Sequence, residues 1–325
     1  MIYPDDFIDQ IICDNNLDVL KTFPSESINC CITSPPYWGL RDYGVEGQLG
    51  LESTPEEYVT KMVEVFREVK RVLRKDGTLW LNLGDSYAGY WGDKKAREEN
   101  RPSMADTNGW TNGFNMNARP DFHNAFDEMK IKPKDLVGIP WMVAFALRAD
   151  GWYLRQDIIW HKPNPMPESV TDRCTKAHEY IFLLAKSAQY YYDNEAIKED
   201  AKLESEKRYK STFHTGKKEI SGQGRPGNAS NTPGYKKWTG KRNKRSVWTV
   251  TTKPFKEAHF ATFPPDLIKP CILAGCPKNG IVLDPFMGSG TTAVVATMYQ
   301  RNFIGFELNP EYCKMAEKRI EPHLM

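Results

Sequence analysis

One stretch decides the fold of this chain: Ile281-Val-Leu-Asp-Pro-Phe-Met-Gly-Ser-Gly-Thr-Thr292. Its first three residues are apolar and mostly β-branched, which predicts a buried strand. The apolar run that follows, Ala293 to Met298, predicts a helix. Between them, Gly288 and Gly290 let the backbone pass close to a ligand, and the helix N-terminus offers free N–H groups. Strand, glycine turn and helix in this order predict an α/β fold with a ligand at the strand end.

The glycine turn disfavours two common ligand classes. No lysine follows the last glycine, so the loop does not match the phosphate-binding pattern, and it also falls short of the G-x-G-x-x-G dinucleotide pattern. A predicted strand from Asn302 to Phe306 ends in Glu307, 17 residues beyond Gly290, where a carboxylate is placed to bind ribose hydroxyls. These features favour a cofactor that contains a nucleoside but no pyrophosphate.

A second stiff stretch follows another predicted strand, Ile28 to Ile32; it reads Thr33-Ser34-Pro35-Pro36-Tyr37-Trp38. The two prolines fix the backbone without free N–H groups, so Ser34 and Tyr37 are held at a strand end. A serine hydroxyl and a proline carbonyl can accept the two N–H bonds of an exocyclic nucleobase amine and direct its lone pair outward. The Tyr37 ring can stack on an extruded base. Alone, this stretch is more typical of a simple X-Pro-Pro turn; the glycine loop favours the catalytic interpretation.

Together the two motifs resemble those of the DNA amino-methyltransferases, which use S-adenosylmethionine. Their amine-methylating motif reads Asp/Asn/Ser-Pro-Pro-Tyr/Phe, and their cofactor motif reads Phe-x-Gly-x-Gly. Here the first motif lies near the N-terminus and the second near the C-terminus, which resembles the permuted order called the β class. The resemblance covers residues 8–198 and 246–321. It implies a circularly permuted, Rossmann-like methyltransferase fold, with a mostly parallel α/β sheet and a DNA-recognition insertion.

The resemblance also implies roles for individual residues. The catalytic group comprises Ser34, Pro35, Pro36 and Tyr37. The cofactor group comprises Asp284, Pro285, Phe286, Gly288, Ser289, Gly290, Thr291, Thr292 and Glu307. Two further cofactor contacts rest on the resemblance alone: Asp14 at the adenine end, and Phe263, with its neighbour Thr262, at the methionine end. A helix N-cap role for Asp14 is an equally good interpretation of the residue type, and both roles could be filled at once.

Composition limits the class of protein. The chain has 325 residues, of which 40% are hydrophobic and 26% charged, and this supports one large α/β domain with an inserted lobe. No apolar run reaches the length of a membrane span, and the N-terminus does not read as a secretory signal. Seven cysteines without a C-x-x-C pattern predict reduced thiols and a cytoplasmic protein. The six histidines show no metal-ligand spacing, so we expect no metal site.

Basic residues gather in one segment. Between Ala201 and Arg245 there are thirteen Lys or Arg and three Asp or Glu, a local charge of +10, and the remainder must carry −8 to give the total of +2. A basic block in an otherwise acidic protein is typical of nucleic-acid contact. In the resembled family this place holds the target-recognition region; a solubilising linker is the competing interpretation. The predicted DNA-binding side chains are Lys236, Lys237, Trp238, Lys241, Arg242, Lys244 and Arg245.

We therefore expect three segments in the chain. Residues 1–200 form the catalytic part, 201–245 the basic target-recognition insertion, and 246–325 the cofactor-binding part of the same domain. Within the first segment, residues 89–128 predict a long loop that either orders on DNA or is a plain surface insertion. Polar residues at a strand end, Asn82 to Tyr87, are candidates for lining the active site.

Local patterns predict several elements. Thr54-Pro-Glu-Glu57 is a capping box that starts a helix, and Asp76-Gly77 predicts a turn before the next strand. Residues 134–148 predict an apolar helix. Two strand-like runs, 178–185 and 189–193, predict a hairpin.

The predicted reaction is methyl transfer from S-adenosylmethionine to the N4 amine of cytosine in double-stranded DNA, by base flipping and in-line displacement. In the resembled family, serine at the first motif position is commoner among N4-cytosine enzymes and aspartate among N6-adenine enzymes. Adenine N6 therefore stays as the alternative target. Transfer to RNA or to a protein glutamine, and an inactive DNA-binding module, are alternatives from other classes. A restriction endonuclease is a candidate partner, and both a monomer and a homodimer are compatible with the sequence.

Overall fold

The computed structural model describes residues 4–40, 42–88, 131–132, 134–207, 239–252 and 263–324. Contacts divide the chain into two units, which are Met1–Tyr192 with Ser246–Met325, and Asp193–Arg245. The smaller unit begins ahead of residue 201, because β6 (Glu199–Asp200) pairs antiparallel with β7 (Lys241–Arg242). The predicted loop over 89–128 lies outside the described residues.

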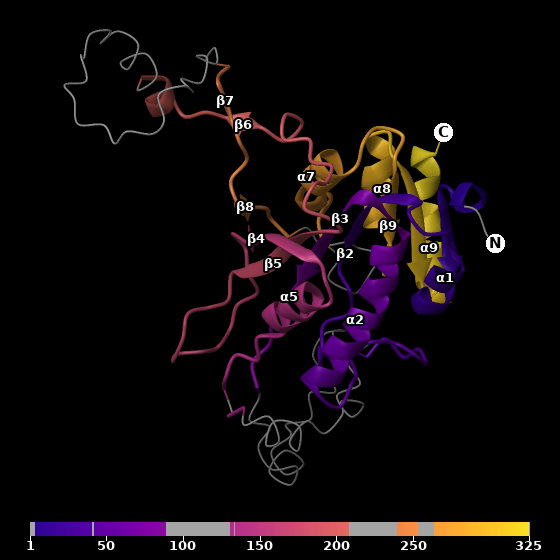
Figure 1. Cartoon of the computed structure of the whole chain (residues 1–325). Coiled ribbons are helices and arrows are strands. Elements are labelled where there is room, and N and C mark those ends of the chain that lie inside the picture. The colour runs from indigo at the N-terminus through magenta and orange to yellow at the C-terminus, as the bar shows by residue number, and fades with distance from the viewer. Residues whose placement is uncertain are drawn as a thin grey trace, which may run out of the picture. The chain divides into compact units, whose positions relative to one another are not determined.

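An eight-stranded mixed sheet forms the centre of the larger unit (Figure 1). The spatial order of its strands is β1-β10-β9-β2-β3-β5-β4-β8. Only β5 runs antiparallel to its neighbours, so the predicted mostly parallel sheet is confirmed. The strands are β1 (Gln10–Cys13), β2 (Ile28–Thr33), β3 (Leu73–Leu83), β4 (Tyr153–His161), β5 (His178–Ala185), β8 (Val247–Thr249), β9 (Ile281–Asp284) and β10 (Asn302–Glu307).

The two C-terminal strands lie between N-terminal ones. β9 pairs with β2 on one side and with β10 on the other, and β10 pairs with β1. Figure 1 shows the yellow end of the chain beside the indigo end. Thr33 and Asp284, which are 251 residues apart in the sequence, therefore stand at neighbouring strand ends. The permuted order of the motifs places both at the carboxyl edge of the parallel strands, where ligands bind in open α/β sheets.

Helices cover both faces of the sheet. On one face α2 packs against both α1 and α5, and on the other α8 packs against both α7 and α9. The alternation of side chains along β2 reflects the two layers, because Cys31 joins the core cluster with α2 while Cys30 lies against Gly275 of α7. The α-helices are α1 (Asn16–Thr22), α2 (Pro55–Val72), α5 (Ile139–Ala149), α7 (Pro265–Gly275), α8 (Thr291–Met298) and α9 (Pro310–Ile320); the 3₁₀ helices are η1 (Pro4–Phe7) and η2 (Glu321–His323). None of the described helices is long and apolar enough to cross a membrane.

The start of α2 follows the predicted capping pattern. The Thr54 side chain accepts a hydrogen bond from the Glu57 amide at 3.1 Å, and the Glu57 carboxylate accepts one from the Ser53 amide at 3.0 Å. One face of the helix is fully buried and includes Tyr58 and Phe66. This burial fixes Tyr58 beneath the Ser-Pro-Pro-Tyr motif, which is where it acts in the site.

Two expectations around β3 and β5 are wrong. β3 begins at Leu73, directly after α2, and the predicted Asp76-Gly77 turn is a bulge within it; Leu73 and Thr78 pair with Ile28 and Cys30 on either side. β5 does not form a hairpin with residues 189–193. Both of its edges are already occupied, one by β3 and the other by β4.

The apolar helix predicted over residues 134–148 is α5, and it starts later than predicted, at Ile139. Leu136 instead forms a bridge with Tyr87, and Gly138 takes a left-handed conformation with φ of 86° that begins the helix. The Asp85 carboxylate accepts hydrogen bonds from the Gly138 and Ile139 amides at 2.9 and 3.1 Å. Asp85, at the end of β3, thus caps α5.

Candidate active site

Asp284 joins the two motifs. It is 1% exposed, and its carboxylate accepts hydrogen bonds from the Thr33 and Thr292 hydroxyls, both at 2.6 Å, and from the Phe286 amide at 3.0 Å. Burial raises the pKa of Asp284 to about 6, although these hydrogen bonds oppose the rise. Asp284, predicted as a cofactor contact, uses its side chain to tie the Ser34 strand end to the glycine loop.

The other polar side chains of the glycine loop also bind protein partners. Arg319 of α9 donates hydrogen bonds to the Ser289 carbonyl, to the Ser289 hydroxyl and to the Thr291 hydroxyl, at 3.1, 3.0 and 2.9 Å. The Pro285 carbonyl accepts a hydrogen bond from Asn16 at 3.0 Å. What the loop offers a ligand is therefore its backbone, the half-buried Phe286 ring and the space over Gly288.

Two glycines give this loop its shape. Gly288 and Gly290 have φ of 53° and 81°, which favours glycine. A Cβ at Gly290 would lie 2.9 Å from the Ala316 side chain, so α9 also requires glycine there. A Cβ at Gly288 would meet only the Phe286 carbonyl, at 4.0 Å. The open side of the turn is therefore over Gly288.

Glu307 stands at the end of β10 beside this open side. Its two carboxylate oxygens accept hydrogen bonds from the Gly288 and Asn309 amides, each at 2.8 Å. Burial raises the pKa of Glu307, and these backbone bonds oppose the rise. Each oxygen keeps a further lone pair, so the carboxylate can also accept a hydroxyl, as the prediction for ribose requires.

The remaining predicted cofactor residues are Asp14 and Phe263. Asp14 is exposed after β1 and does not cap the helix, because Asn15 does so by accepting bonds from the Leu17 and Asp18 amides. The N-cap interpretation of Asp14 is thus wrong by one residue. Phe263 is half-buried just before α7, and Thr262 lies outside the described residues.

Hydrogen bonds and a ring contact hold the Ser-Pro-Pro-Tyr motif in place. Tyr58 donates a hydrogen bond to the Pro36 carbonyl at 2.8 Å, and the Trp38 indole donates one to the Glu52 carbonyl at 2.9 Å. The Tyr37 ring lies against Gly84, since a Cβ there would come within 2.5 Å of it. These contacts hold Ser34 and Tyr37 in place at the end of β2.

Sequence reasoning missed a polar cluster around Tyr37. The Tyr37 hydroxyl lies 2.8 Å from the Glu179 carboxylate, 3.3 Å from the Asn82 amide oxygen and 3.4 Å from the Ser34 hydroxyl. Lys162 forms an ion pair with the other Glu179 oxygen. Burial and the Glu179 charge hold the pKa of Tyr37 well above its usual value. A carboxylate in the otherwise apolar strand β5 was the sequence signal that could have revealed Glu179.

A hollow of about 350 Å³ lies at the same edge of the sheet. It lies between the end of β3 and the start of β5, with His178 and Tyr180 on either side of Glu179 in the chain. Arg173 stacks over the Tyr87 ring at 3.8 Å, and Lys176 donates a hydrogen bond to the Asp85 carbonyl at 2.5 Å. The predicted strand-end residues Asp85 and Tyr87 thus line a cationic, aromatic hollow at the sheet edge where the Ser34 motif also lies.

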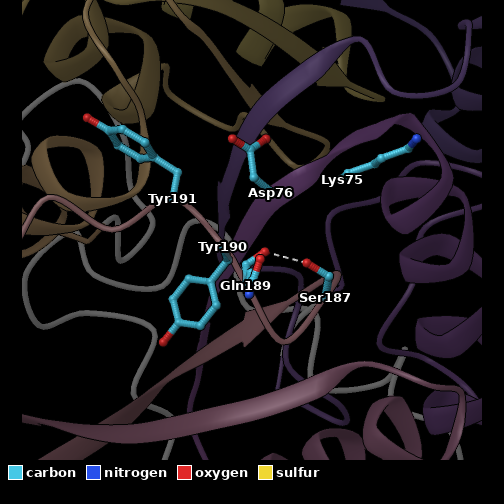
Figure 2. A pocket seen from close by; sticks show the side chains of 6 residues that line it. All are labelled: Lys75, Asp76, Ser187, Gln189, Tyr190 and Tyr191. Atoms are coloured by element: carbon cyan, nitrogen blue, oxygen red, sulfur yellow. Dashed lines mark hydrogen bonds between the residues drawn. The ribbon is translucent and has the colours of Figure 1, made fainter.

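A second hollow, of about 390 Å³, lies at the opposite end of β3. Figure 2 shows its lining by Lys75 and Asp76 from β3 and by four residues after β5, with the Ser187 hydroxyl bonded to Gln189. Since the parallel strands begin here, this hollow is remote from both motifs.

The predicted DNA-binding residues fall in the smaller unit. Lys236, Lys237 and Trp238 lie outside the described residues. Lys241 pairs with Asp200 at 2.5 Å, and Arg242 and Arg245 lie 2.9 and 3.8 Å from Glu199. These ion pairs lie within the smaller unit, and a role of the basic side chains in DNA binding stays a prediction.

Residues 28–318 match the model of a protein family described as DNA methylase, of the N6/N4 type. The chain belongs to this DNA methylase family. A similar relative is the type II methyltransferase M.Cfr9I of Citrobacter freundii, 46% identical over 305 residues that cover 94% of this chain and 85% of the relative. M.SmaI of Serratia marcescens is 43% identical over 317 residues, covering 96% of this chain and 90% of the relative.

Solved structures confirm the methyltransferase fold of this DNA methylase. The PvuII DNA methyltransferase, described as cytosine-N4-specific, aligns with a TM-score of 0.61 and 18% identity over 96% of this chain and 90% of the other. A DNA modification methylase of Thermus thermophilus, solved with S-adenosyl-L-methionine, aligns with a TM-score of 0.57 and 22% identity over 97% of this chain and 95% of the other. The predicted fold is thereby confirmed, and membership of the DNA methylase family supports the predicted family and its cofactor, S-adenosylmethionine.

The residues of this DNA methylase fit S-adenosylmethionine, which supplies a methyl group on an electrophilic sulfonium. The open turn over Gly288 and the Glu307 carboxylate provide for a nucleoside, and no Lys follows the turn to bind a pyrophosphate. Because Asp284 links this loop to Thr33, the cofactor side of the site is positioned relative to Ser34. The protein is a DNA methyltransferase that acts on an exocyclic amine.

Proposed function

We propose that this DNA methylase transfers the methyl group to the N4 amine of cytosine in double-stranded DNA. The observation that carries the proposal is Ser34 at the first motif position, at the end of β2 and tied to the cofactor loop through Thr33 and Asp284. In the resembled family, serine at this position is commoner among the N4-cytosine members, and aspartate among the N6-adenine members. The adenine N6 amine is the alternative target.

In this proposal Ser34 and the Pro35 carbonyl accept the two N–H bonds of the amine. Tyr58 already occupies the Pro36 carbonyl, which supports assigning the second amine bond to Pro35. The amine lone pair is then directed away from both acceptors, toward the cofactor loop. The nitrogen releases its extra proton after the transfer, so the step requires no general base. The protein contributes alignment, base extrusion and exclusion of water.

We assign the extruded base to the Tyr37 ring, and the DNA that flanks it to the hollow lined by Tyr87, Arg173 and Lys176 at the same sheet edge. Aromatic rings and guanidinium planes stack on bases, and cationic groups bind the flanking phosphates. The assignment is supported by the position of this hollow at the same sheet edge as Ser34.

The test uses the purified protein, labelled S-adenosylmethionine and unmethylated genomic DNA. After digestion, the nucleosides are separated and identified by mass spectrometry. N4-methylcytosine is the expected product. N6-methyladenine would overturn the base assignment but keep the assigned role of Ser34. A DNA without new methyl groups, from protein that still binds cofactor, would turn the search to RNA and protein amides.

We further propose that residues 201–245 contact the target DNA, supported by their local charge of +10. Lys241 and Arg242 already pair with carboxylates, so a phosphate must compete for them. We therefore expect Lys236→Ser/Lys237→Ser to reduce the salt slope of DNA binding by about 2, and Lys241→Ser by less than about 1. Equal slopes in fluorescence-anisotropy titrations across a range of salt concentrations would contradict the proposal for 236–237. The type II relatives support a cognate restriction endonuclease as partner.

A further inference from the structure

Four elements bring their polar side chains together behind Ser34. Tyr37 follows β2, Asn82 lies in β3, Glu179 lies in β5 and Lys162 follows β4. Because β5 lies between β3 and β4, Glu179 is placed between Asn82 and Lys162. Its side chain is 16% exposed and that of Lys162 is 19% exposed. The sheet topology thus holds a largely buried carboxylate behind Tyr37, in contact with Tyr37 rather than with Ser34.

Donors and acceptors in this cluster determine where each proton points. A carboxylate paired with an ammonium only accepts hydrogen bonds, so at 2.8 Å the Tyr37 hydroxyl must donate to Glu179. The single Tyr37 proton is thereby used, and its oxygen can accept the Ser34 proton across 3.4 Å. Ser34 then has its own proton directed inward and its lone pairs directed elsewhere.

Asn82 offers the Tyr37 proton a second, more distant and uncharged acceptor. Its amide nitrogen donates to the Tyr180 carbonyl at 2.9 Å, which fixes the orientation of the amide. The same nitrogen lies 3.4 Å from Glu179, and the amide oxygen faces the Tyr37 hydroxyl at 3.3 Å. Since that oxygen cannot donate, the Tyr37 oxygen stays available to Ser34. Lys162, which also stacks over the Trp160 ring at 4.2 Å, completes the charge balance.

We propose that Glu179 is a positioning residue for methyl transfer: by accepting the Tyr37 proton it orients the Ser34 hydroxyl as an acceptor toward the target amine. The proposal rests on the amine-binding role proposed above for Ser34. Without the charged acceptor at position 179, only the neutral Asn82 oxygen at 3.3 Å competes for the Tyr37 proton, and Tyr37 can donate to Ser34 instead. Ser34 would then turn its proton toward the amine lone pair, which is the nucleophile, and oppose the reaction.

The test is a double-mutant cycle in single-turnover methylation. Tyr37→Phe keeps the ring and removes the hydroxyl, and Glu179→Gln replaces the obligate acceptor with a group that can also donate. We expect each to lower the methylation rate about 10–100-fold, the range for a lost hydrogen bond to a charged group. The double variant should lower the methylation rate by less than about 3-fold beyond Tyr37→Phe alone. Without the Tyr37 hydroxyl, Glu179 has no hydrogen bond through which to act on Ser34.

Cofactor and DNA affinities separate a positioning role from a structural one. Calorimetric S-adenosylmethionine affinity and DNA affinity should stay within about 2-fold of wild type in both variants, so that the loss lies in the rate and not in binding. Lys162→Gln/Glu179→Gln removes both charges together and tests whether an unpaired Lys162 causes the loss; it should match Glu179→Gln. The control is Glu68→Gln on α2, which breaks a comparable ion pair with Arg71 at 2.8 Å and should keep wild-type rates.

Each outcome decides one proposal. If the two effects multiply fully, or if Tyr37→Phe keeps the wild-type rate, Glu179 does not act through Tyr37 and the inference fails. If Lys162→Gln/Glu179→Gln recovers wild-type activity, an unpaired charge caused the loss, and the inference fails as well. If Ser34→Ala itself keeps the wild-type rate, the proposed role of Ser34 is wrong and the inference fails with it. The identity of the methylated base, measured by mass spectrometry, tests the proposed target base separately from these outcomes.

Discussion

The two strand ends that make the site use their side chains in opposite ways. At the end of β9 and in the loop that follows, polar side chains bind protein partners and the loop presents its backbone; these side chains are Asp284, Ser289, Thr291 and Thr292. After β2, the backbone is fixed by prolines and braced by Tyr58, and the Ser34 side chain is presented, with one hydrogen bond of 3.4 Å. Side chains thus shape the cofactor loop, whereas in our proposal the catalytic motif acts through the single side chain of Ser34. Changes in the cofactor loop should alter cofactor affinity and protein stability, and changes in the catalytic motif should alter the methylation rate.

The largest expected effect is that of Ser34→Ala. It removes the proposed acceptor for the amine N–H without touching the cofactor loop, so we expect the methylation rate to fall about 10²–10³-fold, as for loss of one positioned polar group in the transition state. Single-turnover methylation gives the rate. Calorimetry should show S-adenosylmethionine affinity within about 2-fold of wild type, because the loop that Asp284 anchors is unchanged.

If Ser34→Ala weakens cofactor binding by as much as it slows methylation, the proposed difference between the two strand ends is wrong. That result would mean that Ser34 shapes the cofactor loop in the manner of Thr33. Ser34→Thr is a useful companion, since it keeps a hydroxyl acceptor but adds a methyl group, and it should retain more activity than Ser34→Ala.

The next largest effect is expected from Gly84→Ala. The new methyl group would fall 2.5 Å from the Tyr37 ring, whereas the Gly84 backbone itself does not require glycine. Tyr37 must therefore shift, and a displacement of about 1 Å near the reacting groups costs about 10²-fold in rate. Methylation kinetics with Gly84→Ala test this expectation, and the unfolding temperature is measured alongside. A wild-type rate would show that the position of Tyr37 is not critical.

The sequence predicted what lies close together in the chain and missed what the sheet brings together. The motif at Ser34 and the loop at Gly288 are local patterns, so their strands, turns and approximate partners could be predicted. Glu179 is separated from Tyr37 by 142 residues, and Arg319 comes from a helix after the next strand. No spacing rule indicates such contacts. Residue type alone also gave a wrong helix cap, because Asp14 was a candidate N-cap and Asn15 caps the helix.

Asp284→Asn should change the pH dependence of stability. Burial raises the pKa of Asp284 to about 6, from about 3.9 in an unfolded chain. Between these values the folded protein holds one more proton than the unfolded one, so this group's contribution to stability falls as pH rises from about 4 to 6. Asparagine does not titrate. The free energy of unfolding of wild type, relative to the variant, should therefore fall by about 2–3 kcal/mol across this window.

Urea denaturation at closely spaced pH values measures this difference. A difference that rises with pH would mean that the hydrogen bonds from Thr33 and Thr292 outweigh burial and depress the pKa of Asp284. Asn can still accept from Thr33 and Phe286, so the geometry of the strand ends is kept and the Ser34-dependent rate should change little above the pKa of Asp284, about 6.

The smallest expected effect tests how the cofactor loop is held. Arg319→Met keeps much of the length of the side chain but removes three hydrogen bonds to Ser289 and Thr291. Because these bonds are partly buried and act on loop shape alone, we expect cofactor affinity to fall about 5–10-fold. At saturating cofactor the methylation rate should return to within about 2-fold of wild type, since the Ser34 side of the site is intact. A rate that stays low at saturation would show that the loop also aligns the reacting methyl group, and the division of labour between the two strand ends would then be incomplete.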